Sequence, residues 1–270
     1  MSKQHLISPQ GRMDSSTIFD DIATYCMFVG YARSGHSLIG ALLDAHPNVI
    51  IADQLDAMKY IQDGIGKQHL FELILHNSQL SVQRGRARGG HLYGVSNQWQ
   101  GRFTSMRVIG DKKGQQATLH LRDDPKLLWK LEQTIALPVK LIHVIRNPYD
   151  NIATKYLKRL RHGTVDFQSL IEEHFLLYQT VADIKRRVAS EDMLDIPHEA
   201  MIERPVLWLQ TLCKFLGINC PDDYTTACSQ VVFSSPNKSR HKIDWDQDDI
   251  ERVRAQMASY DFLSGYSFET

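Results

Sequence analysis

Short apolar runs alternate with amphipathic stretches along most of the chain. Five runs have the nearly continuous hydrophobicity of strands buried on both faces, and they lie at 25–29, 49–52, 107–110, 139–145 and 193–196. Between them, apolar residues at helical spacing predict helices at 37–45, 70–80, 150–160, 167–188 and 205–216. Successive parallel strands need crossover connections, which helices supply. The pattern therefore predicts an α/β fold, a single domain with a central parallel sheet flanked by helices.

The amino terminus and the composition limit the domain organisation and the partners. Residues 1–24 precede the first strand and are expected to form an N-terminal extension of a domain at 25–270. Residues 1–17 lack the apolar core of a signal peptide, and no run of about eighteen apolar residues occurs, so we expect a cytoplasmic protein without a membrane segment. The 31 basic and 31 acidic side chains argue against a nucleic-acid partner, because phosphate contacts need a basic surface. The 4 cysteines form no Cys-x-x-Cys pair, and no metal site is expected.

A glycine-bracketed turn connects the first predicted strand to the first helix. Gly30, Gly35 and Ser37 match the spacing of a phosphate-binding P-loop, but His36 occupies the position of its lysine. Backbone N–H groups at the start of the helix, together with the helix dipole, would bind a phosphate group. A neutral imidazole is a poor substitute for a fixed ammonium, so Arg33 is the candidate cation. The alternative is an ordinary strand-to-helix turn that uses glycine for tightness.

Polar residues also follow other predicted strands. Asp53 follows the second strand, Lys112 follows the strand at 107–110, and Arg146 follows the strand at 139–145. Ligands of open parallel sheets bind at the carboxyl ends of the strands, so these residues and the P-loop-like turn are expected to share one site. Arg146, expected to be exposed, and Thr154, about two helical turns later, suit a second phosphate. The alternative is a surface arginine and an ordinary helix threonine.

These motifs resemble those of sulfotransferases that use 3′-phosphoadenosine 5′-phosphosulfate (PAPS). The segment 33–37, Arg-Ser-Gly-His-Ser, resembles the family's loop for the 5′-phosphosulfate. Arg146-Asn147-Pro148, with Thr154 in place of a serine, resembles its segment for the 3′-phosphate. The resemblance runs from about Cys26 to the end of the chain. It implies nucleotide contacts by Arg33, Ser34, Gly35, His36, Ser37, Leu38, Arg146, Thr154, Lys238, Ser239 and Arg240.

The reaction implied by the resemblance is transfer of a sulfuryl group from PAPS to a hydroxyl or amine, which leaves adenosine 3′,5′-bisphosphate. Arg33 and Lys112 would stabilise the charge that develops on the oxygen bridging to the 5′-phosphate. No metal ion is required, because these two cations can neutralise the leaving group. The segments 43–49 and 110–112 resemble the branch that sulfates carbohydrates and protein tyrosines.

The general base has more than one candidate. The glutamate used by that branch would fall on Gln54 or Leu55, so Asp53 is the first candidate and Asp56 the second. An amine or an acidic acceptor would need no strong base. His36 is expected to stay charged beside a phosphate, which argues against it as the base.

The acceptor is expected to be a small molecule or a glycan. The segment Arg84–Gly90 is rich in arginine and glycine and is expected to lack regular structure. It could be a mobile lid, a collar for an anionic acceptor or a solvated loop. Tyr93, Trp99 and Phe103 are candidates for the acceptor pocket or for the core. Two other functions stay open. A P-loop kinase-like phosphotransferase should have lysine at position 36 and a carboxylate for magnesium, and a nucleotide-binding protein would lack catalysis.

Overall fold

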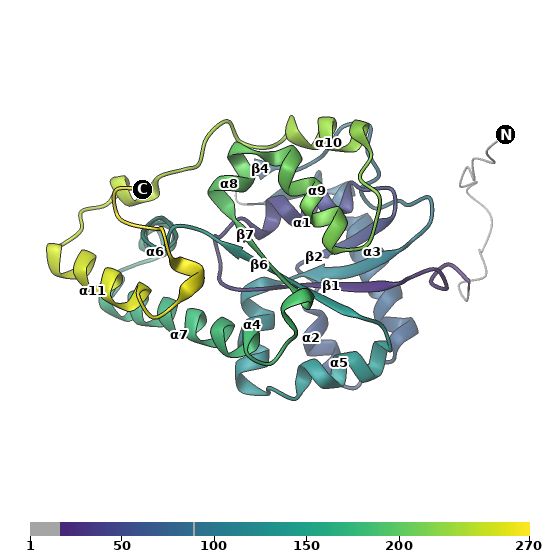
Figure 1. The fold of residues 1–270 in the computed structure, drawn as a ribbon, viewed down its shortest axis with the longest axis horizontal. Helices are drawn as coiled ribbons and strands as arrows, with labels where there is room; N and C mark the ends of the chain where they lie inside the picture. Colours follow the sequence, from purple (N-terminus) through teal and green to yellow (C-terminus); the bar gives the residue numbers. More distant parts are fainter. Residues whose placement is uncertain (1–16, 89) are drawn as a thin grey trace.

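Five parallel strands form the central sheet in the order β2-β5-β1-β6-β7 (Figure 1). The computed structural model describes residues 17–88 and 90–270. The strands are β1 (Thr24–Val29), β2 (Val49–Asp53), β5 (Val108–Lys112), β6 (Val139–Ile145) and β7 (Met193–Pro197). The five predicted strands and the α/β fold are thus confirmed.

The order of the strands brings their carboxyl ends together at a switch point. From β1 the chain continues to β2 and β5 on one side of β1, and then to β6 and β7 on the other side. Open α/β sheets bind ligands where the strand order reverses in this way. Gly30, Arg146 and His198 follow β1, β6 and β7, and Asp53 and Lys112 end β2 and β5.

Helices cover both faces of the sheet. The sequence predicted five of them, α1 (His36–Asp44), α3 (Lys67–Gln83), α6 (Pro148–Leu160), α7 (Phe167–Lys185) and α9 (Pro205–Phe215), and they are confirmed. The structure adds α2 (Ala57–Gln62), α4 (Gly114–Asp123), α5 (Leu127–Ile135), α8 (His198–Glu203), α10 (Asp222–Ser229) and α11 (Gln247–Met257).

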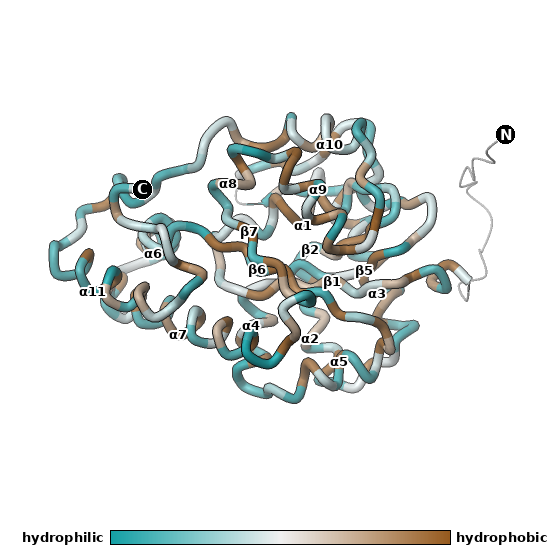
Figure 2. The backbone as a smooth tube through the Cα atoms, in the orientation of Figure 1, coloured by the Kyte–Doolittle hydropathy of each residue, from teal (hydrophilic) through white to brown (hydrophobic). Residues whose placement is uncertain are grey.

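Alternate residues of the central strand face different layers. Cys26 and Phe28 belong to a cluster with α1, α9 and α10, whereas Met27 and Val29 belong to a cluster with α2, α3, α4 and α5. All four side chains are at most 3% exposed, as expected for a parallel strand buried on both faces. The hydrophobic strands run through the middle of the molecule in Figure 2. A third apolar cluster joins α6, α7 and α11 beside the carboxyl edge of the sheet.

The expectation that Arg84–Gly90 lacks regular structure is wrong. Within this segment β3 (Ala87–Arg88) pairs antiparallel with β4 (His91–Leu92). Arg86 is buried and forms an ion pair with Asp44, the last residue of α1. The buried guanidinium fixes the base of this hairpin, whereas Arg84, Gly85, Ala87 and Arg88 are exposed.

Other expectations concern the chain ends and the surface. Phe19 and Ile22 pack into the core, whereas residues 1–16 lie outside the described residues, and the predicted domain boundary at 25 stays a prediction. None of the helices in the described part of the chain has the length and hydrophobicity needed to cross a membrane. All 4 cysteines are free.

Candidate active site

A cavity of about 610 Å³ lies at the carboxyl edge of the sheet. Its wall combines the turn after β1, the start of α4, the residues after β6 and β7, and the β3–β4 hairpin. Five lining side chains are cationic, and none of the described lining residues is acidic. The cations are Arg33, Arg88, Lys113, Arg146 and Lys158. The described lining of this cavity is therefore positively charged in a chain with no net charge.

The turn after β1 has the backbone geometry of a phosphate cradle. Arg33 and Gly35 have φ angles of 71° and 106°, and Gly35 precedes α1 without any side-chain cap on the helix. A Cβ atom at Gly35 would collide with the imidazole of His198, so glycine is required by contact as well as by conformation. The first N–H groups of α1 are left for a ligand.

Helix α4 holds this turn in place from the neighbouring segment. Gly30 N donates to Thr118 Oγ1 over 2.7 Å, and Ala32 N donates to Gln115 Oε1 over 3.1 Å. Both acceptors lie on a helix that the sequence analysis did not assign. These contacts fix the backbone at two of the three positions before the exposed Arg33.

His36 and Ser34 lie beneath the cradle. The His36 Nε2 atom is 3.1 Å from the carbonyl oxygen of Val29, and Ser34 Oγ donates to the carbonyl oxygen of Tyr31 over 2.9 Å. Burial, with the positive charge of Lys112, lowers the pKa of His36 to about 3. This low pKa favours a neutral imidazole, whereas the expectation of a charged ring concerns His36 beside a bound phosphate and stays a prediction.

Lys112 connects the base candidate to the cradle. Its ammonium forms an ion pair with Asp53 and donates to Ser37 Oγ over 3.2 Å. The lysine side chain is only 1% exposed, and it passes close to Gly40 of α1, where any side chain would displace it. Arg88 from the hairpin donates to the same carboxylate over 2.6 Å. Burial alone would raise the pKa of Asp53, but Lys112 and Arg88 together lower it.

The structure separates the two base candidates. Asp56 immediately precedes α2 and faces His120, with Oδ1 at 3.2 Å from Nε2, and it does not line the cavity. The turn between the two aspartates is held by Asp111, whose carboxylate accepts hydrogen bonds from the N–H groups of Leu55, Asp56 and Ala57. Burial raises the pKa of Asp111 to about 6. Asp111 thus performs the capping that an aspartate within the turn would otherwise provide.

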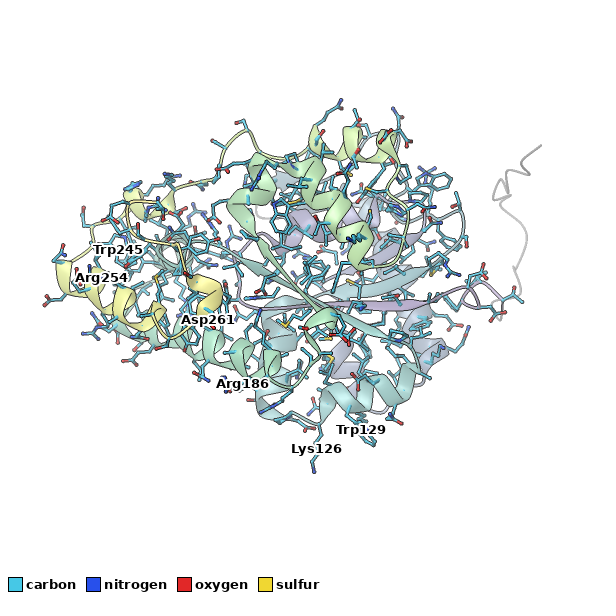
Figure 3. The ribbon with its side chains drawn as sticks, in the orientation of Figure 1. Lys126, Trp129, Arg186, Trp245, Arg254 and Asp261 are labelled. Carbon is cyan, nitrogen blue, oxygen red and sulfur yellow. The ribbon has the colours of Figure 1, made fainter. Side chains whose placement is uncertain are left out.

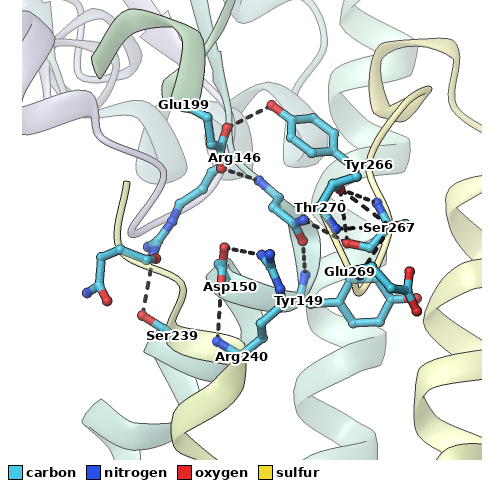
Figure 4. A network of polar contacts seen from close by, with 12 residues as sticks. Arg146, Tyr149, Asp150, Glu199, Ser239, Arg240, Tyr266, Ser267, Glu269 and Thr270 are labelled. Carbon is cyan, nitrogen blue, oxygen red and sulfur yellow. Dashed lines mark hydrogen bonds and ion pairs between the residues drawn. The ribbon is translucent and has the colours of Figure 1, made fainter. Parts of the chain in front are cut away.

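Arg146 and Thr154 form a second polar centre together with Ser239, and Figure 4 shows Arg146 and Ser239. Arg146 donates to Thr154 Oγ1 over 3.1 Å, to the carbonyl oxygen of Arg33 over 3.0 Å and to Ser239 Oγ over 3.3 Å. Thr154 Oγ1 in turn donates to Ser239 Oγ over 2.9 Å. The three predicted residues thus lie together. Arg146 is only 5% exposed, however, so the expected exposure is corrected.

Lys238, Ser239 and Arg240 do not line the cavity, although Ser239 contacts the lining residues Arg146 and Thr154. Lys238 is exposed on the chain just before the short helix at Ser239–Lys242. The Arg240 guanidinium is buried and donates to Asp150 Oδ2 over 2.6 Å, and its backbone N–H donates to the other carboxylate oxygen. Its Nε and Nη2 atoms have no partner among the described residues. Arg240 therefore supports the segment that carries Ser239.

The sequence analysis missed His198 as a site residue. This residue begins α8, lines the cavity, and has its Nδ1 atom buried without a partner among the described residues. Burial, with the charge of Arg146, lowers the pKa of His198 to about 3. The available signal was its position directly after a predicted strand, the same rule that selected Arg146.

Comparison with known families agrees with this geometry. A sequence profile described as "Sulfotransferase family" matches residues 27–222 of the chain. The protein belongs to the sulfotransferase family. The matched range contains the cradle, Asp53, Lys112 and Arg146, whereas Ser239 and Arg240 lie beyond it. No curated protein sequence matches the chain significantly. The predicted enzyme class is confirmed, and the predicted branch stays a prediction.

Solved structures show the same sulfotransferase fold. The sulfotransferase domain of the olefin synthase of Synechococcus PCC 7002 has a TM-score of 0.54 and 15% identity, with 89% of this chain and 96% of that chain covered. The sulfotransferase domain of the curacin biosynthetic pathway has a TM-score of 0.54 and 15% identity, with 89% of this chain and 98% of that chain covered. Sulfotransferase STF9 from Mycobacterium avium has a TM-score of 0.52 and 12% identity, with 96% of this chain and 83% of that chain covered. At these identities the likeness concerns the fold alone.

Proposed function

We propose that this sulfotransferase transfers the sulfuryl group of PAPS to a hydroxyl or amine of a small-molecule or glycan acceptor. The observation that carries the proposal is the pairing of two anion sites in one cavity. The cradle at 33–37, with Lys112 behind it, forms one site, and the Arg146–Thr154–Ser239 centre forms the other. The carbonyl oxygen of Arg33 accepts a hydrogen bond from Arg146, so the two sites adjoin.

The residues present fit a nucleotide with phosphate groups at both ends of its ribose. The described lining of the cavity has five cationic side chains and no carboxylate. The buried, unpartnered Nδ1 of His198 offers one further polar contact between the two sites. A magnesium nucleotide is normally held through one or two carboxylates, which this lining lacks, so the kinase alternative gains no support.

Each residue would have a separate role in the reaction. When bound, PAPS supplies the sulfur electrophile, and the bond from sulfur to the 5′-phosphate oxygen breaks with its electron pair as the acceptor oxygen or nitrogen bonds to sulfur. The cradle amides and Ser37 would orient the 5′-phosphate. Arg33 and Lys112 would stabilise the charge that grows on the departing oxygen.

The proton of the acceptor would go to Asp53. An aspartate that is paired with Lys112 and Arg88 is a weak base, because both cations favour its ionised form. Lys112 also donates to Ser37. An anion held at Ser37 therefore competes with Asp53 for the ammonium, and a shift of Lys112 toward that anion makes the carboxylate a stronger base. Catalysis would then be coupled to occupation of the cradle.

Transfer of labelled sulfate from PAPS to a pool of alcohols, phenols and amines tests the proposal. We expect transfer by the wild-type chain and by the matched control Arg186→Ala, an exposed arginine after α7 (Figure 3). Arg33→Ala and Lys112→Ala should reduce the rate at least about a hundredfold. Binding of adenosine 3′,5′-bisphosphate without transfer to any acceptor would indicate a nucleotide-binding protein. Binding of magnesium ATP but not of the bisphosphate would indicate a kinase.

A further inference from the structure

A second cavity of about 180 Å³ lies beside Asp53, between α3 and the β3–β4 hairpin. Its described lining comprises Asp53, Asn77, Leu80, Ser81, Arg84, Ala87 and Arg88. Arg88 also lines the larger cavity, so its side chain lies on the boundary between the two. The base candidate Asp53 faces this smaller cavity. A molecule that occupies it would therefore touch the proposed proton acceptor.

Arginines at alternate positions of the hairpin have different environments. Arg86 is buried, and its guanidinium donates to the carbonyl oxygen of Ile51 over 2.9 Å in addition to the ion pair with Asp44. Arg84 and Arg88 flank it and both line the smaller cavity. The guanidinium of Arg84 forms no hydrogen bond or ion pair with any described residue. Arg86 thus anchors a segment with two further cations. Arg84 has no partner among the described residues, and Arg88 is paired with Asp53.

The charge around the smaller cavity favours an anion. Arg84 and Arg88 line it, and Lys112 lies directly behind Asp53. These three cations face a single carboxylate, which already has two cationic partners. The buried anchor at Arg86 reduces the ordering cost that a flexible arginine pair would incur on binding. Arginine is also the side chain best suited to planar, bidentate recognition of an oxyanion.

We propose that the smaller cavity is a subsite for a carboxylate or sulfate group of the acceptor, which we call the acid subsite. Arg84 and Arg88 bind this group, and the hydroxyl to be sulfated lies at Asp53. This inference rests on the proposed function and specifies its acceptor as a hydroxy acid or an acidic sugar. It also links acceptor binding to catalysis. When Arg88 turns toward the acceptor's acid group, Asp53 loses one of its two cations and becomes a stronger base.

Matched acid and amide acceptors test the acid subsite. Labelled PAPS is offered with glucuronate or glucuronamide, with 4-hydroxyphenylacetate or its amide, and with 3-hydroxybutyrate or its amide. We expect kcat/KM to favour the acid of the best-used pair about tenfold or more, the effect of one charge-assisted hydrogen bond. In Arg84→Gln the ratio of acid to amide should fall severalfold, because only Arg88 remains to bind the acid group, whereas Arg186→Gln should keep the wild-type ratio.

Calorimetry separates failure of the acid subsite from failure of the proposed function. Adenosine 3′,5′-bisphosphate should bind Arg84→Gln as tightly as wild type, because Arg84 does not line the larger cavity. Each acid is also titrated into the bisphosphate-loaded protein. Equal use of acids and amides, an acid preference that is undiminished in Arg84→Gln, or no binding of any acid to the loaded protein would each overturn the acid subsite. Loss of bisphosphate binding in the wild type would instead overturn the proposed function.

Discussion

Two buried arginine–aspartate pairs hold the two loops that flank the cavity. Asp44 at the end of α1 binds Arg86 and so anchors the β3–β4 hairpin, and Asp150 in the first turn of α6 binds Arg240 and so anchors the segment with Ser239. Each aspartate lies on the helix that follows one of the proposed phosphate sites. Each helix therefore provides a ligand-facing end and a carboxylate that fixes a distant loop.

The two pairs differ in how firmly the rest of the structure holds them. Asp44 also accepts hydrogen bonds from Ser78 and from the N–H groups of Ile51 and Gly101, which tie α1 to β2 and α3. Asp150 binds only Arg240 through its side chain, and two of the guanidinium nitrogens have no partner among the described residues. The comparison indicates that the Asp44 pair belongs to the folding core, whereas the Asp150 pair mainly positions the nucleotide site.

The largest expected effect is that of Asp44→Ala on stability. Removing one member of a buried ion pair leaves an uncompensated charge and lowers the free energy of unfolding by about 3–5 kcal/mol. Denaturant titration of the variant measures this loss. As a control, Asp44→Ala combined with Arg86→Met should recover part of the stability, because the double variant no longer buries an unpaired guanidinium. No recovery would show that the loss comes from the other hydrogen bonds of Asp44.

Asp150→Ala should destabilise the fold less and weaken the nucleotide site more. The segment around Arg240 can move into solvent locally, so we expect a loss of about 2 kcal/mol in the free energy of unfolding. Calorimetry should show at least about tenfold weaker binding of adenosine 3′,5′-bisphosphate, because Ser239 loses its support. If this variant loses as much stability as Asp44→Ala, the proposed difference between the two pairs is wrong.

Ser239→Ala isolates the contact that the Asp150 pair positions. The substitution removes one hydroxyl that bonds to Arg146 and Thr154. We expect bisphosphate affinity to fall about tenfold and the free energy of unfolding to fall by about 1 kcal/mol, because the hydroxyl is buried. Ser259→Ala, at an exposed position outside the cavity, is the control for calorimetry and denaturation. Unchanged affinity would remove Ser239 from the nucleotide site.

A further effect concerns acid sensitivity, which the two pairs do not control. Burial lowers the pKa of His36, His174 and His198 to about 3. Their ordinary pKa is about 6.5, so the unfolded chain binds the protons first as the pH falls. Above pH 6.5 the neutral rings contribute their whole share of the free energy of unfolding. As the pH falls from 6.5 toward 3, each ring lowers that free energy by about 1.4 kcal/mol for every pH unit.

His174→Phe tests this dependence, because neither of its ring nitrogens has a partner among the described residues. Between pH 6.5 and pH 5 the slope of unfolding free energy against pH should fall by up to about 1.4 kcal/mol per pH unit relative to wild type. The control His69→Phe replaces an exposed histidine of α3 and should leave the slope unchanged. An unchanged slope in His174→Phe would contradict the assignment of a buried neutral ring.

Local pattern predicted the sheet and the ends of its strands, but not the contacts between distant segments. Apolar runs and the Gly30–Gly35 spacing are local properties, so β1, β6 and the cradle could be found from sequence. Thr118, by contrast, holds Gly30 across a separation of 88 residues, and no local signal reports such a contact. The same reason explains the incorrect expectations for Arg84–Gly90 and Arg146, since burial of an arginine depends on a carboxylate or carbonyl from elsewhere in the fold.

The central claim is that Arg146 and its partners bind a 3′-phosphate in the same cavity as the cradle. Calorimetry tests this claim on wild type and on Arg146→Gln, each titrated with adenosine 3′,5′-bisphosphate and with adenosine 5′-monophosphate. The monophosphate lacks the 3′-phosphate, and the variant lacks the arginine. We predict that the variant binds the bisphosphate about a hundredfold more weakly than wild type, with little change for the monophosphate. An equal loss for both nucleotides would contradict the claim, because it would show that Arg146 supports the cavity without contacting the 3′-phosphate.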